Sequence, residues 1–177
     1  IIAVSGGMRD DVLDCYPFID PAKIHVVYNG INTEVYHPEK ATNALEEHGV
    51  DPAKPYVLFV GRITRQKGIS HLLRAARMFD EDIPLVLCAA SPDTPELGAE
   101  VAEAVAELKR TRQDVHWIDA QLSRDDVVQF LSHALLFACP SVYEPLGIVN
   151  LEAMGCEAPV VASAVGGIPE VVVDGET

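Results

Sequence analysis

Short apolar runs alternate with amphipathic stretches along most of the chain. Five of these runs have the length of buried strands. They are residues 56–60, 85–89, 115–118, 135–139 and 160–162. Between the runs, apolar residues recur at the spacing of one helix face, as at Ile69, Leu72 and Ala76. The predicted helices are 68–79, 95–110, 124–133 and 148–154.

Strands that alternate with helices of this length predict right-handed βαβ units. The predicted fold class is therefore α/β, a Rossmann-like parallel sheet with helices on both faces. In such sheets, ligands bind at the carboxyl ends of the strands. The less regular first part of the chain is expected to hold short strands and short helices. These are strands over 1–5 and 24–28, and helices over 10–16 and 44–48.

We expect three parts along the chain. Residues 1–30 are the end of a preceding domain and the crossover from it. Residues 31–55 are a polar connector punctuated by proline, and residues 56–177 are the main domain, truncated at its carboxyl end. The chain opens on Ile1 without an initiator methionine or a basic leader, which is typical of a cut inside a larger protein.

Composition narrows the function classes. A net charge of −14 disfavours non-specific binding to nucleic acid, which needs a basic surface. The uncharged stretch 158–169 is broken by glycine and proline and is too short to span a bilayer. The four cysteines include no Cys-x-x-Cys pair, and Cys88 and Cys139 lie in apolar runs, so we expect buried thiols and a reducing, cytoplasmic location. The six histidines lack metal-ligand spacing, so no metal site is expected.

Two glutamates, Glu144 and Glu152, flank residues 145–151 directly after a predicted strand. Pro145 and Gly147 indicate a tight turn, with the proline at the first position of a helix. The start of a helix offers free backbone N–H groups and a positive dipole end, which together form an anion site. Glu144 is then expected at the mouth of this site, and Glu152 about two turns along its wall.

A second candidate anion site is Gly61-Arg62-Ile63-Thr64-Arg65-Gln66-Lys67-Gly68, between the first regular strand and a helix. Its glycines let the backbone approach a ligand, and Arg62 and Lys67 supply two cations that suit a diphosphate. The segment matches neither a Walker loop nor the Gly-x-Gly-x-x-Gly fingerprint. The alternative interpretation is a solvated basic loop.

The glutamate pair also raises the hypothesis of a glycosidase. Retaining hydrolases hold their two carboxyl groups about 5 Å apart, whereas eight helical positions span roughly 12 Å along the axis. The pair therefore fits two parts of a long ligand better than the two sides of one bond. The structural alternative is a helix N-terminal charge at Glu144 and an exposed face charge at Glu152.

Two glycine pairs have no single interpretation from the sequence. Gly166-Gly167, within Val165-Gly166-Gly167-Ile168-Pro169-Glu170, permits either a close backbone approach or a simple turn. Gly6-Gly7 leaves the same two alternatives open.

Four motifs follow one another in the chain. They are Gly61-Arg62 with Lys67-Gly68, Pro140-Ser141, Glu144-x7-Glu152, and Gly166-Gly167-Ile168-Pro169-Glu170. In this order they resemble the carboxyl-terminal, donor-binding half of retaining glycosyltransferases with two facing Rossmann-like domains, the GT-B type. The resemblance covers essentially the whole chain, and residues 2–31 look like the end of the first domain and the crossover.

Within this family, residues 143–154 look closest to actinobacterial glycogen synthases. These use ADP-glucose, and some make maltose 1-phosphate from glucose 1-phosphate. Leu146 stands where many bacterial glycogen synthases carry cysteine.

The resemblance implies a role for each motif. Arg62 and Lys67 would bind the donor diphosphate and neutralise the leaving nucleotide, and Glu144 would contact the transferred sugar. These three are the candidate catalytic residues. Glu152 would accept hydrogen bonds from the ribose, and the backbone N–H groups of residues 146–149 would hold the distal phosphate and sugar. The implied substrate-binding positions are Gly61, Gln121, Leu122, Ser141, Leu146, Gly147, Ile148, Val149 and Glu152.

The implied function is transfer of glucose from a nucleotide sugar, ADP-glucose by this resemblance, to an α-glucan or glucose 1-phosphate in glycogen synthesis. No metal cofactor is implied. A lipid-directed mannosyltransferase, a sucrose- or trehalose-type synthase and a sugar-nucleotide epimerase remain alternatives, although the two glutamates favour transfer over epimerisation. The expected partners are the donor, a glucan or sugar-phosphate acceptor, and the N-terminal domain of the same enzyme. Without that domain we expect the chain to bind nucleotide but to be inactive.

Overall fold

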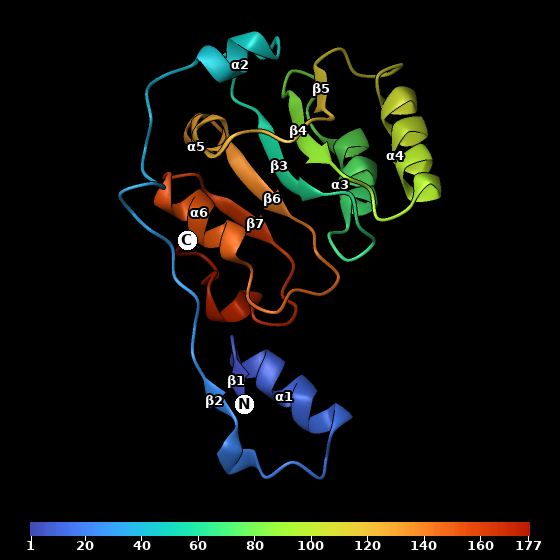
Figure 1. Ribbon diagram of the computed structural model, residues 1–177. Helices are drawn as coiled ribbons and strands as arrows, with labels where there is room; N and C mark the ends of the chain where they lie inside the picture. The colour runs from blue at the N-terminus through green and yellow to red at the C-terminus, as the bar shows by residue number, and fades with distance from the viewer.

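The computed structural model describes residues 1–177 and contains a five-stranded parallel sheet (Figure 1). Its strands are β3 (Val57–Arg62), β4 (Leu85–Ala90), β5 (Val115–Ile118), β6 (Leu136–Cys139) and β7 (Val160–Ala162). All five lie where the apolar runs predicted them. The largest boundary difference is at β3, which continues through Gly61 and Arg62; these two residues pair with Ala89 and Ala90 of β4. Arg62 is thus held by the sheet and does not belong to the loop that follows it.

Helices cover both faces of this sheet. On one face lie α3 (Ile69–Ala75), its 3-10 extension η2 (Ala76–Met78) and α4 (Pro95–Leu108). On the other face lie α2 (Asn43–Glu47), α5 (Arg124–Ser132) and α6 (Ile148–Gly155). Alternate residues of one strand serve the two layers, since Val57 and Phe59 pack with α3 and α4 whereas Leu58 packs with α5 and α6. Burial on both faces explains why the strands read as continuous apolar runs.

The strand order is β5-β4-β3-β6-β7. The chain adds β4 and β5 on one side of β3, and then returns to place β6 and β7 on the other side. The order of addition therefore reverses between β3 and β6. Ligands of open α/β sheets bind outside the carboxyl ends of the strands at such a switch point, which directs attention to the loops after β3 and β6.

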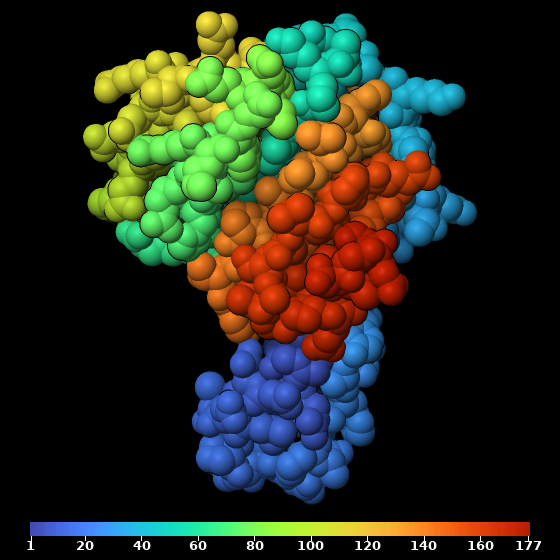
Figure 2. All heavy atoms as spheres, turned by 180° about the vertical axis from the view of Figure 1, so that it is seen from behind, coloured from blue at the N-terminus to red at the C-terminus, as the bar shows by residue number.

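The first elements of the chain form a small two-stranded sheet outside the main sheet. β1 (Ile2–Ala3) and β2 (His25–Val26) pair in parallel, and α1 (Gly6–Cys15) and η1 (Pro21–Lys23) lie between them in sequence. Viewed from behind, this blue unit forms a lobe that touches the red C-terminal residues (Figure 2). The predicted helix was too short, since α1 begins at Gly6 rather than Asp10. Ser5 explains the earlier start, because its side chain accepts the N–H of Met8 as an N-cap.

The connector runs along the α6 side of the main sheet to α2 (Figure 1). Gly155 of α6 lies so close to Ile31 and Tyr36 that a Cβ would find no room there. Further on, α2 packs against α5, and the buried Gln129 accepts the N–H of Ala44 at 2.9 Å. The last element is the 3-10 helix η3 (Ile168–Glu170). None of the helices combines the length and the apolar character needed to cross a membrane.

Candidate functional site

The loops that follow β3 and β6 lie against each other at the switch point. The N–H of Val142 donates to the carbonyl of Gln66 at 2.9 Å. Gly68 has a left-handed backbone (φ +65°), and a Cβ there would overlap the carbonyl oxygen of Pro140. The two segments predicted as separate anion sites therefore form one continuous edge.

Lys67 and Glu144 form an ion pair at this edge. Lys67 Nζ lies 2.7 Å from Glu144 Oε2, and the two side chains are 25% and 10% exposed. Ser141 also donates to Glu144 Oε2, at 3.3 Å, and Thr64 accepts the backbone N–H of Lys67 at 3.0 Å. A carboxylate this deeply buried requires such partners. The resemblance assigned Lys67 to the donor diphosphate and Glu144 to the transferred sugar. The structure pairs these two side chains directly.

The start of α6 carries unpaired backbone donors. Gly147 is the N-cap in a left-handed conformation (φ +92°), and no side chain caps the helix. The N–H groups of residues 146–149 donate to no backbone or side-chain acceptor. Pro145 is not the first helical residue, contrary to the prediction, since the left-handed turn at Gly147 delays the helix to Ile148. Unpaired donors at a helix start are suited to an anion, so the anion site stays a prediction, with Gly147 rather than Pro145 at the N-cap.

Arg62 belongs to a neighbouring pocket of about 260 Å³ at the carboxyl ends of β3 and β4. Gly61, Gln121 and Leu122 line the same pocket, so three predicted substrate-binding positions meet the candidate catalytic Arg62 there. The Arg62 side chain is 70% exposed and pairs with Asp93 at 3.3 Å. An exposed pair of this kind contributes little to stability and leaves the guanidinium accessible to a ligand.

Glu152 lies on α6, next to the connector. Burial raises the pKa of Tyr36 to about 12, and the second cause is the adjacent Glu152 carboxylate, with which the hydroxyl interacts. The spacing estimate from the sequence assumed one helix from Glu144 to Glu152, and this assumption was wrong, because Glu144 precedes the helix. Only the rise from Ile148 to Glu152, about 6 Å, is helical. The two glutamates nevertheless have different neighbours, Lys67 for one and Tyr36 for the other.

Sequence reasoning missed Asn150, in the first turn of α6. Its side chain is fully buried, and neither amide atom has a hydrogen-bond partner. Leaving such an amide unpaired costs about 1–3 kcal/mol. The signal was a single amide within the apolar run Ile148-Val149-Asn150-Leu151.

Gly166 and Gly167 allow their own backbone to lie against the backbone of Glu144. The N–H of Gly167 donates to the carbonyl of Glu144 at 2.9 Å. Gly166 has φ +54°, and a Cβ there would overlap the same carbonyl oxygen. This glycine pair therefore supports the backbone of Glu144. No group of three or more His, Cys, Asp or Glu side chains is arranged to hold a metal ion.

The profile of the family described as Glycosyl transferases group 1 matches residues 40–177. The chain belongs to this family. Its membership confirms the predicted glycosyltransferase class, while the roles of individual site residues stay predictions.

Similar proteins agree with this membership. Alpha-maltose-1-phosphate synthase of Mycolicibacterium smegmatis is 56% identical over 180 residues, which is 100% of this chain and 46% of that protein. D-inositol 3-phosphate glycosyltransferase of Mycobacterium sp. (strain KMS) is 38% identical over 159 residues, or 89% of this chain and 36% of that protein. The chain thus spans about half, or less, of the length of the curated relatives it matches.

A solved structure confirms the fold. The Anabaena protein Alr3699/HepE, crystallised in complex with UDP and glucose, matches with a TM-score of 0.83 at 23% sequence identity. The match covers 97% of this chain and 46% of the Anabaena chain. The predicted Rossmann-like α/β domain of the GT-B type is therefore confirmed.

Proposed function

We propose that this chain is the donor-binding half of a retaining glycosyltransferase that moves glucose from ADP-glucose to an α-glucan or glucose 1-phosphate in glycogen synthesis. The observation that carries the proposal is the uncapped start of α6 beside the Lys67–Glu144 pair. Unpaired N–H groups and a nearby ammonium suit the phosphates of a nucleotide sugar. The donor and the acceptor both come from the resemblance to actinobacterial glycogen synthases, and the 56% identity to alpha-maltose-1-phosphate synthase supports that choice.

In this proposal the charged groups divide the donor between them. Arg62 and Lys67 bind the diphosphate, and the carboxylate of Glu144 both orients Lys67 and faces the transferred sugar. When the bond between the sugar and the phosphate breaks, negative charge grows on the leaving nucleotide. Cations and helix N–H groups already in position stabilise that charge without rearranging. No metal is required for this step, because the protein supplies the positive charge.

The remaining parts of the enzyme are proposals as well. Residues 1–30 would belong to a first domain that brings the acceptor, residues 31–55 to the connector, and residues 56–177 to the donor domain. The pocket beside Arg62 would receive the base through Gln121 and Leu122. All four cysteines are free thiols, which supports a cytoplasmic enzyme.

Donor choice is testable by isothermal titration calorimetry. We expect ADP to bind more tightly than UDP or GDP, and ADP-glucose to bind with an added contribution from its sugar. A preference for GDP and GDP-mannose would contradict the proposal in favour of a mannosyltransferase. The 38% identity to D-inositol 3-phosphate glycosyltransferase supports an inositol phosphate acceptor as a second candidate, which an acceptor screen of the two-domain enzyme would separate.

The 177-residue chain itself is expected to bind ADP-glucose weakly and to transfer no sugar, because the acceptor-bearing domain must complete the cleft. Incubation with ADP-glucose and either glycogen or glucose 1-phosphate, followed by ADP release, measures this. Sustained transfer by the chain alone would contradict the assignment as a donor half.

A further inference from the structure

The N-cap residue of α1 and one side chain within the helix contact the residues on both sides of Glu144. Ser5 is completely buried, and its hydroxyl accepts the N–H of Met8 and donates to the carbonyl of Pro145. Asp11, further along α1, accepts a hydrogen bond from the Tyr143 hydroxyl at 3.0 Å. None of the roles assigned above uses these contacts, although they adjoin the proposed sugar site.

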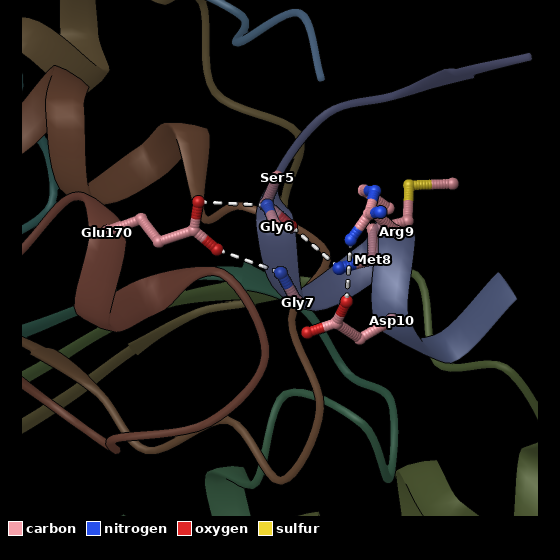
Figure 3. A network of polar contacts seen from close by, with 7 residues as sticks. All are labelled: Ser5, Gly6, Gly7, Met8, Arg9, Asp10 and Glu170. Atoms are coloured by element: carbon pink, nitrogen blue, oxygen red, sulfur yellow. Dashed lines mark hydrogen bonds and ion pairs between the residues drawn. The ribbon is translucent and has the colours of Figure 1, made fainter. Parts of the chain in front are cut away.

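Glu170 makes a second connection to α1, at the other end of the chain (Figure 3). Its two carboxylate oxygens accept the N–H groups of Gly6 and Gly7, each at 2.9 Å, and the Tyr28 hydroxyl donates at 2.9 Å. The pKa of Glu170 is lowered, chiefly by the bonds from Gly6 and then Gly7. A carboxylate suits this place, because the first turn of a helix attracts negative charge.

From Glu170, η3 leads directly back to Glu144. The N-cap of η3 is Gly167, whose N–H donates to the carbonyl of Glu144 at 2.9 Å, and the N–H of Glu170 donates to Gly167 at 3.1 Å. A Cβ on Gly7 would lie 2.8 Å from the carbonyl oxygen of Gly166, so α1 and this turn are in direct contact. The backbone of Glu144 is therefore connected to α1 by two routes.

We propose that Ser5 and Glu170 are positioning residues, which fix the Glu144 loop (residues 143–147) to the N-terminal segment. The orientation of the Glu144 carboxylate then depends on how that segment is docked. The expected effect on sugar binding rests on the proposed function. The attachment of the Glu144 loop to the N-terminal segment does not depend on that function. Residues 1–30 would belong to the acceptor domain. The geometry of the donor site around Glu144 would therefore depend on the position of the acceptor domain.

Amide hydrogen exchange of the 177-residue chain tests the structural part. Ser5→Ala and Glu170→Gln should each speed exchange of the Gly167 N–H by about tenfold, because local opening follows the hydrogen bonds that are lost. Two matched controls lie elsewhere. Ser123→Ala removes the N-cap of α5, and Glu39→Gln alters a carboxylate that likewise accepts two backbone N–H groups, from Lys40 and Ala41. Both controls should leave Gly167 within about twofold of the parent.

Calorimetry tests the consequence in the same variants. Ser5→Ala and Glu170→Gln should lower the affinity for ADP-glucose by several-fold and leave that for ADP unchanged, since Glu144 faces the sugar. Exchange at Gly167 no faster than in the controls would overturn the proposal. Faster exchange with an unchanged ratio of the two affinities would also overturn it, because the contact would then be structural only. Failure of the parent chain to bind either ligand would refute the proposed function, and the exchange rates would still decide the inference.

Discussion

Lys67→Ala is expected to lower both the free energy of unfolding and the affinity for ADP. Breaking a buried ion pair costs about 3–5 kcal/mol when one charge stays buried without a partner. Lys67 is 25% exposed and Ser141 still donates to Glu144, so we expect a smaller loss of about 2 kcal/mol. Loss of a charged contact to phosphate should weaken ADP binding by about 1.5–3 kcal/mol, while adenosine binding stays nearly unchanged.

Two further variants separate these effects. Lys67→Ala with Glu144→Gln removes the buried charge as well, so stability should largely return while ADP affinity stays low. Lys54→Ala breaks an ion pair with Asp114 whose side chains are 49% and 37% exposed, and should cost at most about 1 kcal/mol. Chemical denaturation and calorimetry measure the two quantities. ADP binding equal to that of the parent in Lys67→Ala would refute the diphosphate assignment, and Arg62→Ala offers an independent check of it.

Glu152→Ala is expected to weaken ADP binding by about 1.5–3 kcal/mol, roughly a tenfold to hundredfold loss, because a carboxylate that accepts ribose hydroxyls forms charged hydrogen bonds. Glu144, the glutamate assigned to the transferred sugar, should behave differently. Glu144→Gln should leave ADP binding intact or tighter, since Lys67 is released from its partner, and should weaken only ADP-glucose.

The control for Glu152 is Tyr36→Phe. This change removes the phenol hydroxyl beside Glu152 and leaves the carboxylate in place. It should therefore preserve ADP affinity if the ribose role is correct. Melting curves recorded beside the titrations exclude a folding defect. Equal losses for ADP and ADP-glucose in Glu144→Gln, as in Glu152→Ala, would show that the two glutamates do not divide the ligand.

The sequence by itself determined the elements and the class of the fold. A run such as residues 85–89 is apolar at every position because both of its faces are buried, and the helix over 95–110 shows one apolar stripe because only one face is. The apolar run and the apolar stripe follow from the side-chain repeat of a strand and of a helix, so the sequence alone shows them. The family was also determined at this level, since its motifs are ordered short strings around Arg62, Glu144 and Gly166.

The tertiary structure decided which of these elements meet. The reversal between β3 and β6 brings Lys67 against Glu144, and no local pattern encodes strand order. It also decided the start of α6, where the left-handed conformation of Gly147 outweighs the preference of Pro145 for a first turn. The contact of Glu170 with Gly6 joins residues 164 positions apart, which only the closed fold makes neighbours. Periodicity reports how each segment is buried, whereas the site depends on long-range pairings that form when those segments pack together.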